Sequence, residues 1–392
     1  MYNHIFSCLF SGNAIALKMS ECSCLSVTLM LRIARTALET NKHDPDLICD
    51  ITGFAEAGQA LISLVDKVIF TGSPGVGVHV MRAAATRLTP CVLELGGKDP
   101  VIVCDSAPLD DVIPIVMRGT FQGSGQNCIG IERVLVFASV HDEFVRKVTP
   151  AVRALRQGRP LDDEGNWRSV DVGATTTPEQ AAHVLELIAD ARRSGAKIVV
   201  GGEENAEAVA EAGGGVYVRP TLVVGVTEGM RIFREEVFGP VMCVVKVKGD
   251  SEDEAVRLAN ATQYGLGSNV YSRSIPQAER IAARLEAGMT NVNDMALNYM
   301  AQSLPFGGVK NSGYGRFAGR EGLRECCRIK SVTSGKPTIL PAALGYPIED
   351  RSHKFIGGMM DTFYGTSISQ RVAGTMAMLW QLGIGGVIQQ ML

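Results

Sequence analysis

Short apolar runs alternate with segments of helical periodicity along the first third of the chain. The runs are bounded by turn residues, as expected for buried strands, and the segments between them carry apolar residues three and four positions apart. The predicted strands are 14–17, 47–51 and 67–70, and the predicted helices are 21–39 and 55–64. Repeated strand–helix units of this length predict an α/β fold with a parallel sheet and right-handed crossovers.

The same alternation continues through the middle of the chain. The further strands are predicted at 101–104, 133–137, 197–200, 241–247 and 268–271, and the further helices at 109–121, 142–155, 178–194, 252–261 and 276–287. Residues 201–216 are rich in Gly, Glu and Ala and are expected to form a solvated loop.

The pattern changes after Lys336, where three prolines precede an apolar, Met-rich segment with few charges, 354–392. We expect a helical tail there, which packs on its own domain or on another subunit. The alternative is a helix that lies on a membrane surface. Its polar face lacks the Lys and Arg density that such helices usually carry.

Composition narrows the class of protein. The 392 residues carry a net charge of −3 and are 6% aromatic, so neither a basic surface nor stacking platforms indicate a nucleic-acid partner. The ten cysteines show no CxxC and no paired spacing, which favours a reduced, intracellular compartment and argues against a metal site. No run of 18 apolar residues free of charge predicts a spanning helix.

Cys128 ends a glycine-rich turn, Gly-Ser-Gly-Gln-Asn-Cys, that follows a predicted helix. A glycine-rich approach exposes a thiol and leaves backbone N–H groups free to hold an oxyanion. A nucleophilic cysteine is one interpretation, and an inert buried thiol is the other.

Glu94 lies within the apolar strand segment Leu-Glu-Leu-Gly-Gly. A buried carboxylate is costly and tends to have a raised pKa, which suits a general base near neutral pH. The alternative is a structural ion pair, with Lys98 as the nearest candidate partner.

Three other segments have features of a cofactor site. Glu236 would bind hydroxyl groups of a ligand and Phe238 would lie against a planar ring; the alternative is that both belong to a solvated turn. Lys18 and Glu21 follow a strand end, where a carboxylate accepts a hydrogen bond from a ribose hydroxyl; the alternative is ordinary surface charge. The turn at 71–77 joins a strand to a helix and directs backbone N–H groups at a phosphate, although it is not a GxGxxG fingerprint.

Seven segments, taken in order, resemble the NAD(P)-dependent aldehyde dehydrogenase superfamily. They are GNAIALK (12–18), FTGSPGVG (70–77), LELGGKDP (93–100), GQNC (125–128), EEVFGPV (235–241), YGLGSNVYS (264–272) and PFGGVKNSGYGR (305–316). The resemblance implies an α/β aldehyde dehydrogenase fold with an incomplete Rossmann-like cofactor domain and an α/β catalytic domain. The implied divisions are the remainder of the NAD-binding domain at 1–96, the catalytic domain 97–309, a return segment and oligomerisation arm 310–335, and a C-terminal extension 336–392.

The resemblance implies the oxidation of an aldehyde to a carboxylic acid with NAD. Cys128 would attack the carbonyl to form a thiohemiacetal, and its backbone N–H would help to hold the oxyanion. Collapse with hydride transfer would leave a thioester, and Glu94 would activate the water that hydrolyses it. The substrate pocket is expected to include Asn127, Ile129 and Asn293.

The cofactor residues that the resemblance implies are Lys18, Glu21, Gly72, Ser73, Glu236 and Phe238. The first two would hold the adenine ribose, which favours NAD over NADP, and the next two would contact the pyrophosphate. The last two would lie at the nicotinamide ribose and its ring. A homo-oligomer is also expected.

One branch of the family, found in plants and fungi, has motifs that resemble SGQNC, VNDMA and PFGGVK of this sequence. Its members often have an N-terminal membrane anchor and a C-terminal extension. This implies a location in the cytoplasm or on the cytosolic face of the endoplasmic reticulum. In this family the Asn side chain of a Trp-Asn segment is the second oxyanion donor, and the segment lies upstream of the ribose-binding lysine. The distance between the two in the family is greater than the number of residues that precede Lys18 here. Asn3 and Asn13 do not match it, so we expect an N-terminally truncated cofactor domain.

Because the second oxyanion donor of the family is not found, two alternatives to an active dehydrogenase are open. One is a catalytically impaired protein of the family fold that acts as a subunit or scaffold. The other is a cofactor-independent thiol esterase, because Cys128 and Glu94 suffice for acylation and hydrolysis.

Overall fold

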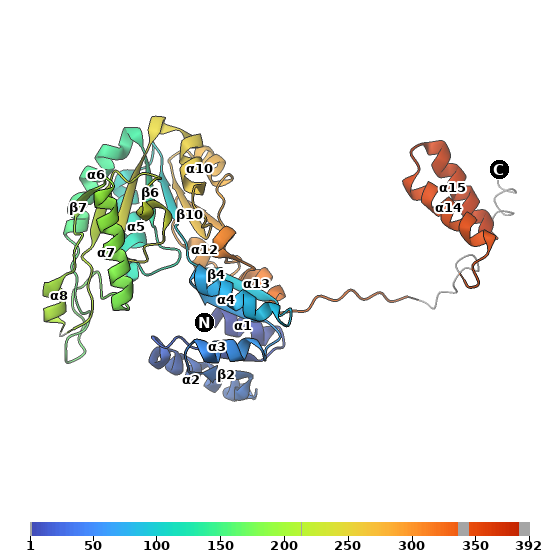
Figure 1. The fold of residues 1–392 in the computed structure, drawn as a ribbon, viewed down its shortest axis with the longest axis horizontal. Coiled ribbons are helices and arrows are strands. Elements are labelled where there is room, and N and C mark those ends of the chain that lie inside the picture. Colours follow the sequence, from blue (N-terminus) through green and yellow to red (C-terminus); the bar gives the residue numbers. More distant parts are fainter. Residues whose placement is uncertain (1, 213, 336–344, 384–392) are drawn as a thin grey trace. The chain divides into compact units, whose positions relative to one another are not determined.

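The computed structural model of the chain describes residues 2–212, 214–335 and 345–383. The chain divides into two compact units, residues 1–328 and 329–392 (Figure 1). The larger unit contains the sheets and is an α/β fold.

A seven-stranded sheet forms the centre of the larger unit, in the order β11-β10-β5-β6-β9-β8-β7. Neighbouring strands are parallel except for β7 and β8, which are antiparallel. The strand bounds are β5 (Pro100–Val103), β6 (Arg133–Phe137), β7 (Lys197–Val200), β8 (Thr221–Val224), β9 (Val241–Val247), β10 (Gly267–Tyr271) and β11 (Met289–Val292).

Helices cover both faces of this sheet, which explains the near-continuous apolar character of its strands. On one face, α5 (Leu109–Phe121) and α6 (Ala138–Arg153) pack on alternate strand residues such as Val101 and Val134. On the other, α7 (Pro178–Arg193), α10 (Glu252–Asn260) and α11 (Ile275–Ala282) pack on the intervening residues, such as Ile102 and Leu135. The parallel α/β architecture expected from the sequence is confirmed.

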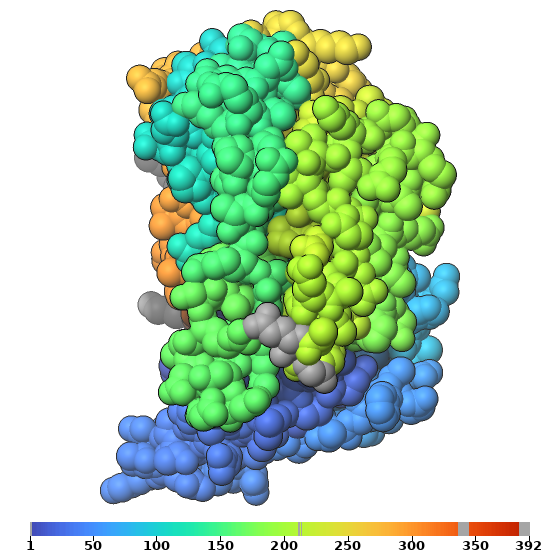
Figure 2. Space-filling model, turned by 90° about the vertical axis from the view of Figure 1, so that its left-hand side faces the viewer, coloured from blue at the N-terminus to red at the C-terminus, as the bar shows by residue number. Residues whose placement is uncertain are grey.

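Two smaller sheets lie at one end of this unit, where the N-terminal residues are coloured blue in Figures 1 and 2. One joins β1 (Ile15–Lys18) to β2 (Ile48–Ile51) in parallel. The other has the order β12-β4-β3, with β3 (Val68–Gly72), β4 (Cys91–Leu95) and β12 (Gly313–Tyr314). The helices here are α1 (Tyr2–Phe10), α2 (Cys24–Thr40), α3 (Ala55–Ile62) and α4 (Pro74–Ala85).

Short elements complete the larger unit. They are α8 (Ala206–Glu211), α9 (Arg231–Arg234), α12 (Leu297–Met300), α13 (Gly319–Glu325), and the 3-10 turns Pro45–Leu47, Gln122–Gly125, Lys248–Asp250 and Lys310–Ser312.

Two local predictions were wrong. Residues 201–216 are not all loop, because α8 forms there: the Asn205 side chain accepts a hydrogen bond from Ala208 N at 3.2 Å, and Ala208 is buried. The turn predicted at 71–77 is shorter, since β3 extends to Gly72 and α4 begins at Pro74. Ser73 caps that helix, and proline suits its first position.

The smaller unit holds a helical hairpin of α14 (Asp350–Tyr364) and α15 (Ile368–Gln381). The helices meet at Gly358 and Gly374, where a Cβ on either would press on the other's carbonyl oxygen. Many apolar side chains of this hairpin are exposed, and among the described residues no helix is long and apolar enough to cross a membrane. The predicted helical tail is present up to Gln381, and residues 384–392 lie outside the described ranges.

Candidate active site

Cys128 follows a turn of unusual backbone conformation between α5 and β6. Gly123, Ser124 and Gly125 all have positive φ, at 63°, 60° and 71°. A Cβ on Gly125 would overlap the carbonyl oxygen of Gly239, so the turn packs closely on the loop before β9. This packing fixes where the chain delivers the cysteine.

The Cys128 thiol is half-buried, with Asn127 Oδ1 at 3.9 Å from its Sγ. Burial and the nearby Glu94 carboxylate raise the pKa of this thiol. No described residue accepts a hydrogen bond from the Cys128 backbone N–H. That N–H is therefore free to bind an oxygen that becomes negatively charged at the substrate carbonyl.

Glu94 faces the thiol because strand residues alternate in direction. Its neighbours Leu93 and Leu95 pack with Val80 of α4, so Glu94 points to the opposite side of β4. The carboxylate is 3% exposed, and its Oε1 has no hydrogen-bond partner among the described residues. Burial raises its pKa to about 7, although the Cys128 thiol partly opposes this.

Glu236 joins the same cluster through the turn that follows β4. Its Oε1 accepts a hydrogen bond from Gly97 N at 3.1 Å, and a Cβ on Gly96 would collide with its carboxylate. Burial raises the pKa of Glu236 to about 7, and the negative charges of Glu132 and Glu94 act in the same direction. A proton is thus exchangeable near neutral pH at two carboxyl groups of this cluster.

A buried ion pair supports the loop that carries Glu236 and Phe238. Glu132 Oε2 lies 2.5 Å from Lys98 Nζ, and both side chains are almost fully buried. Glu132 also accepts hydrogen bonds from Val237 N and Phe238 N, at 2.9 and 2.8 Å. Lys98 was the candidate partner for an ion pair with Glu94, but it pairs with Glu132 instead.

Phe238 is held in a strained conformation by these bonds. Its φ is 48°, in the left-handed region that is costly for a bulky residue. Gln180 Nε2 donates to the carbonyl oxygens of Val237 and Phe238 at 2.8 and 3.2 Å. The side chains of Glu132 and Gln180 therefore fix the backbone at Phe238.

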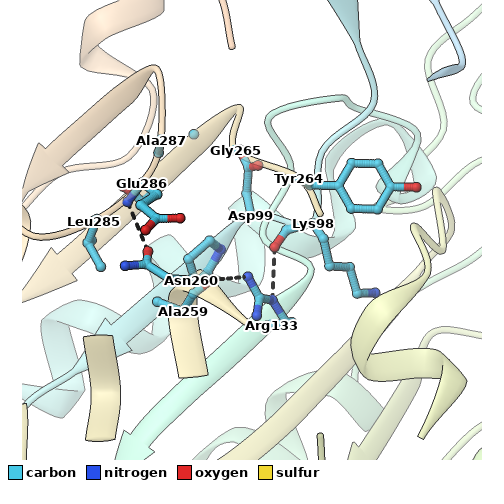
Figure 3. A pocket seen from close by; sticks show the side chains of 13 residues that line it. Lys98, Asp99, Arg133, Ala259, Asn260, Tyr264, Gly265, Leu285, Glu286 and Ala287 are labelled. Carbon is cyan, nitrogen blue, oxygen red and sulfur yellow. Dashed lines mark hydrogen bonds between the residues drawn. The ribbon is translucent and has the colours of Figure 1, made fainter. Parts of the chain in front are cut away.

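Asp99 is a further buried carboxylate near the thiol, and sequence analysis missed it. Burial raises the pKa of Asp99 well above the usual range, although the backbone of Gly267 partly opposes this. Figure 3 shows Asp99 and Arg133 among the residues that line a pocket. The pocket has a volume of about 10 Å³, which has room for a water molecule and not for a substrate. Arg133 donates there to the carbonyl oxygen of Lys98 at 2.9 Å.

The three residues expected in the substrate pocket have different surroundings. Asn127 Oδ1 accepts from Ile129 N at 3.3 Å and so shapes the turn around the thiol. Ile129 lines a small pocket that also includes Asn291. Asn293 does not line that pocket. Its amide bonds to the backbone N–H and carbonyl oxygen of Ser272, at 2.9 and 2.8 Å, which fastens the end of β11 to β10.

The segments expected to hold the adenosine moiety of a cofactor lie at strand and helix ends. Lys18 closes β1 and pairs with Glu21 at 3.2 Å, and both side chains reach solvent. Ser73 accepts from Val76 N at the start of α4, directly after Gly72. A helix start and a strand-end carboxylate suit a pyrophosphate and a ribose hydroxyl, so these residues fit a dinucleotide.

Asn13 has a structural contact and does not act at the thiol. Its amide Nδ2 donates to the carbonyl oxygens of Cys8 and Cys326, at 3.4 and 2.9 Å. Among the described residues, no group of three or more His, Cys, Asp or Glu side chains is arranged to hold a metal ion.

A comparison with protein-family models matches residues 1–332 to the aldehyde dehydrogenase family, and the chain belongs to that family. An aldehyde dehydrogenase-like protein of Schizosaccharomyces pombe is 39% identical over 93% of this chain and 70% of its own length. One of Saccharomyces cerevisiae is 38% identical over 94% of this chain. The chain spans 58% of the length of that second relative.

Solved structures agree with this assignment. A Mycobacterium tuberculosis aldehyde dehydrogenase complexed with NAD+ is 32% identical, with a TM-score of 0.77 over 86% of this chain and 67% of its own. A glyceraldehyde-3-phosphate dehydrogenase of Methanocaldococcus jannaschii complexed with NADP is 29% identical, with a TM-score of 0.75 over 84% of this chain and 68% of its own. The aldehyde dehydrogenase fold is therefore shown.

Proposed function

We propose that this protein oxidises an aldehyde to a carboxylic acid with NAD+ as the hydride acceptor. The observation that carries the proposal is the buried carboxylate of Glu94, incompletely paired and facing the Cys128 thiol. A structural role explains neither its burial without a cation nor its pKa near 7. A nucleophile with an adjacent base is the arrangement that covalent catalysis requires.

The raised pKa values set the order of proton transfers. The resting thiol of Cys128 is protonated, and Glu94 accepts its proton as the sulfur attacks the aldehyde carbon. The backbone N–H of Cys128 stabilises the oxyanion of the thiohemiacetal. When bound, NAD+ supplies the acceptor for the hydride that leaves this carbon as a thioester forms.

Glu94 then acts a second time. After it has released the proton of the thiol to solvent, its carboxylate removes a proton from a water molecule, which attacks the thioester carbonyl and releases the carboxylic acid. The sulfur of Cys128 leaves as a thiolate and receives the proton that Glu94 took from the water molecule. One carboxylate with a pKa of about 7 can serve both steps, because it accepts and returns protons near neutral pH.

The cofactor preference is included in the proposal. Lys18 and Glu21 form a pair at the end of β1, with the Glu21 carboxylate exposed enough to accept from ribose hydroxyls. That negative charge would repel a 2′-phosphate, which favours NAD+ over NADP+. Glu236 would bind the nicotinamide ribose, and Phe238 would lie beside the ring.

The test is NADH formation by the full chain with short, long and aromatic aldehydes. We expect turnover that Cys128→Ser abolishes, while Cys327→Ser, which changes an exposed thiol, leaves it unchanged. Full dehydrogenase activity of Cys128→Ser would overturn the proposal. Ester hydrolysis without NAD+, lost in Cys128→Ser, would identify a thiol esterase instead, and no turnover of either kind would support a scaffold.

We also propose that the chain belongs to the plant and fungal branch indicated by its motifs, which its likeness to two fungal relatives supports. A homo-oligomer and a contact of residues 354–392 with a subunit or a membrane surface remain predictions. Exposed Phe363, Tyr364 and Trp380 on the hairpin favour a covered surface there. Sedimentation of the full chain with and without lipid vesicles distinguishes the two contacts.

A further inference from the structure

Two thiols that the proposed function does not use lie against each other. Cys8 is in α1 and Cys326 directly follows α13, yet their Sγ atoms are 3.8 Å apart. Either thiol can donate a hydrogen bond to the other. The contact joins two positions 318 residues apart in the chain, so tertiary structure alone brings the pair together.

The backbones on both sides of this contact are tied together by independent hydrogen bonds. The Asn13 amide bridges the carbonyl oxygens of Cys8 and Cys326, as described above. Ser11 Oγ donates to Leu323 O at 3.1 Å, which links the end of α1 to α13. The thiols therefore approach on segments whose positions are fixed by bonds that do not involve sulfur.

The surroundings of the pair make the two sulfurs unequal. The hydrogen bond from Cys8 and the positive charge of Lys67 lower the pKa of Cys326 to about 7, against the opposing effects of burial and Glu325. The pKa of Cys8 is raised, because its proton is held in that bond and the group is partly buried. Lys67 is itself fixed by Glu325, with Nζ and Oε2 2.5 Å apart.

The pair therefore has the features of a nucleophilic thiol and a resolving thiol. Both residues are half-buried and not sealed in the core. Cys104, Cys128 and Cys243 differ, since burial raises the pKa of each of them and so reduces its thiolate fraction. Near neutral pH, Cys326 combines thiolate character with a second thiol at contact distance.

We propose that Cys8 and Cys326 form a redox-modification site that closes to a disulfide on reaction with a hydroperoxide. The Cys326 thiolate attacks the peroxide, the O–O bond breaks, and an alcohol or water leaves as Cys326 becomes a sulfenic acid. The Cys8 thiol then attacks that sulfur and expels water as the S–S bond forms. Two thiols are oxidised, one hydroperoxide is reduced, and two hydrogens leave with the oxygen atoms.

The disulfide would join α1 to α13 and close a loop of more than three hundred residues. Such a cross-link restricts the unfolded chain, so the oxidised protein should unfold at a higher temperature than the reduced protein. Disulfide formation at this site does not require dehydrogenase activity, so it can be tested independently of the proposed function.

The experiment treats the full chain with one equivalent of hydrogen peroxide, alkylates the remaining thiols and maps non-reduced peptides by mass spectrometry. We expect a Cys8–Cys326 linked peptide to be the first oxidation product, to disappear on reduction, and to be absent from Cys8→Ser and Cys326→Ser. Cys327→Ser is the matched control, because this neighbouring thiol is exposed, and it should still form the link.

A second measurement keeps the proposal testable if the linked peptide is hard to recover. In Cys8→Ser the sulfenic acid has no resolving thiol, so dimedone should label Cys326. Oxidation of Cys128 ahead of the pair, a Cys326–Cys327 link, or a Cys326 that dimedone leaves unlabelled in Cys8→Ser would each overturn the proposal.

Discussion

Glu132 Oε2 accepts a hydrogen bond from Lys98 Nζ at 2.5 Å inside the protein, and the same carboxylate receives the N–H groups of Val237 and Phe238. One side chain thus connects the segment after Glu94 to the loop proposed to hold the nicotinamide ribose. Its charge is compensated by one cation and two backbone donors, which offsets the cost of its burial.

Breaking this buried pair should destabilise the protein strongly. We expect Glu132→Gln or Lys98→Met to lower the free energy of unfolding by about 3–5 kcal/mol, because each leaves a buried group uncompensated. The double variant should lose less than the sum of the two single losses. Urea unfolding followed by circular dichroism measures all three.

The matched control is Glu235→Gln, which removes one partner of the half-exposed ion pair with Arg231. We expect it to cost less than about 1 kcal/mol, as exposed pairs do. If Glu132→Gln costs no more than this control, Glu132 does not support the loop as described.

The raised pKa of Glu94 makes stability depend on pH in a defined direction. Its pKa is about 7 in the folded protein against an ordinary value of 4.5, so the folded state favours the protonated form. The stabilisation that the protonated Glu94 side chain gives the folded state is fully present below pH 4.5, and it is lost as the pH rises to about 7. The difference between the pKa values of the folded and unfolded states corresponds to about 3 kcal/mol in the free energy of unfolding.

Glu94→Gln removes this penalty and should therefore be more stable than the natural protein at pH 8, by up to about 3 kcal/mol. The two proteins should converge near pH 4. Unfolding free energies measured across this range test the prediction, and a constant difference between the proteins would contradict it.

Gly125 should be intolerant of a side chain, and Gly123 provides a close comparison. Both have positive φ, but a Cβ on Gly125 would overlap the carbonyl oxygen of Gly239, whereas nothing lies within 4 Å of one on Gly123. We expect Gly125→Ala to reduce NADH formation by roughly tenfold or more by displacing Cys128, and Gly123→Ala to change it far less. Equal effects would show that backbone strain, and not the contact with Gly239, is responsible.

The rate of thioester hydrolysis should rise with pH through about 7, since Glu94 acts as a base only when ionised. Glu236→Gln should move this rise to lower pH, because its carboxylate and that of Glu94 disfavour each other's ionisation. Single-turnover kinetics with a preformed acyl-enzyme measure the profile. An unchanged midpoint in Glu236→Gln would show that the two carboxylates are not coupled.

The regular elements of the large sheet were predictable because their residues carry local signals. The predicted helix at 109–121 and strand at 133–137 agree with α5 and β6, whose apolar patterns match their burial. The helix α8 was missed although Asn205 before Ala-Glu-Ala is a capping signal, because the glycines and charges around it suggested a loop.

Contacts between distant segments were not predictable from a single sequence. Glu132 lies 34 residues after Lys98, and no local pattern shows that their side chains meet between two elements. The same holds for Asp99, which is buried by strands that are far away in the chain. The register of β11 beside β10 places Asn291 against Asn269 and leaves Asn293 beyond the strand end, and the role of Asn293 in a substrate pocket stays a prediction.

The roles of Cys128 and Glu94 are tested most directly by the intact mass of Glu94→Gln after incubation with an aldehyde and NAD+. We expect at most one equivalent of NADH, formed more slowly than in the natural protein because Glu94 no longer takes the proton of the Cys128 thiol. The protein should become heavier by one acyl group, because the thioester is no longer hydrolysed. The added mass should be absent from Cys128→Ser and should leave on treatment with hydroxylamine. Sustained turnover by Glu94→Gln with no added mass would contradict the assignment of Cys128 and Glu94 as nucleophile and base.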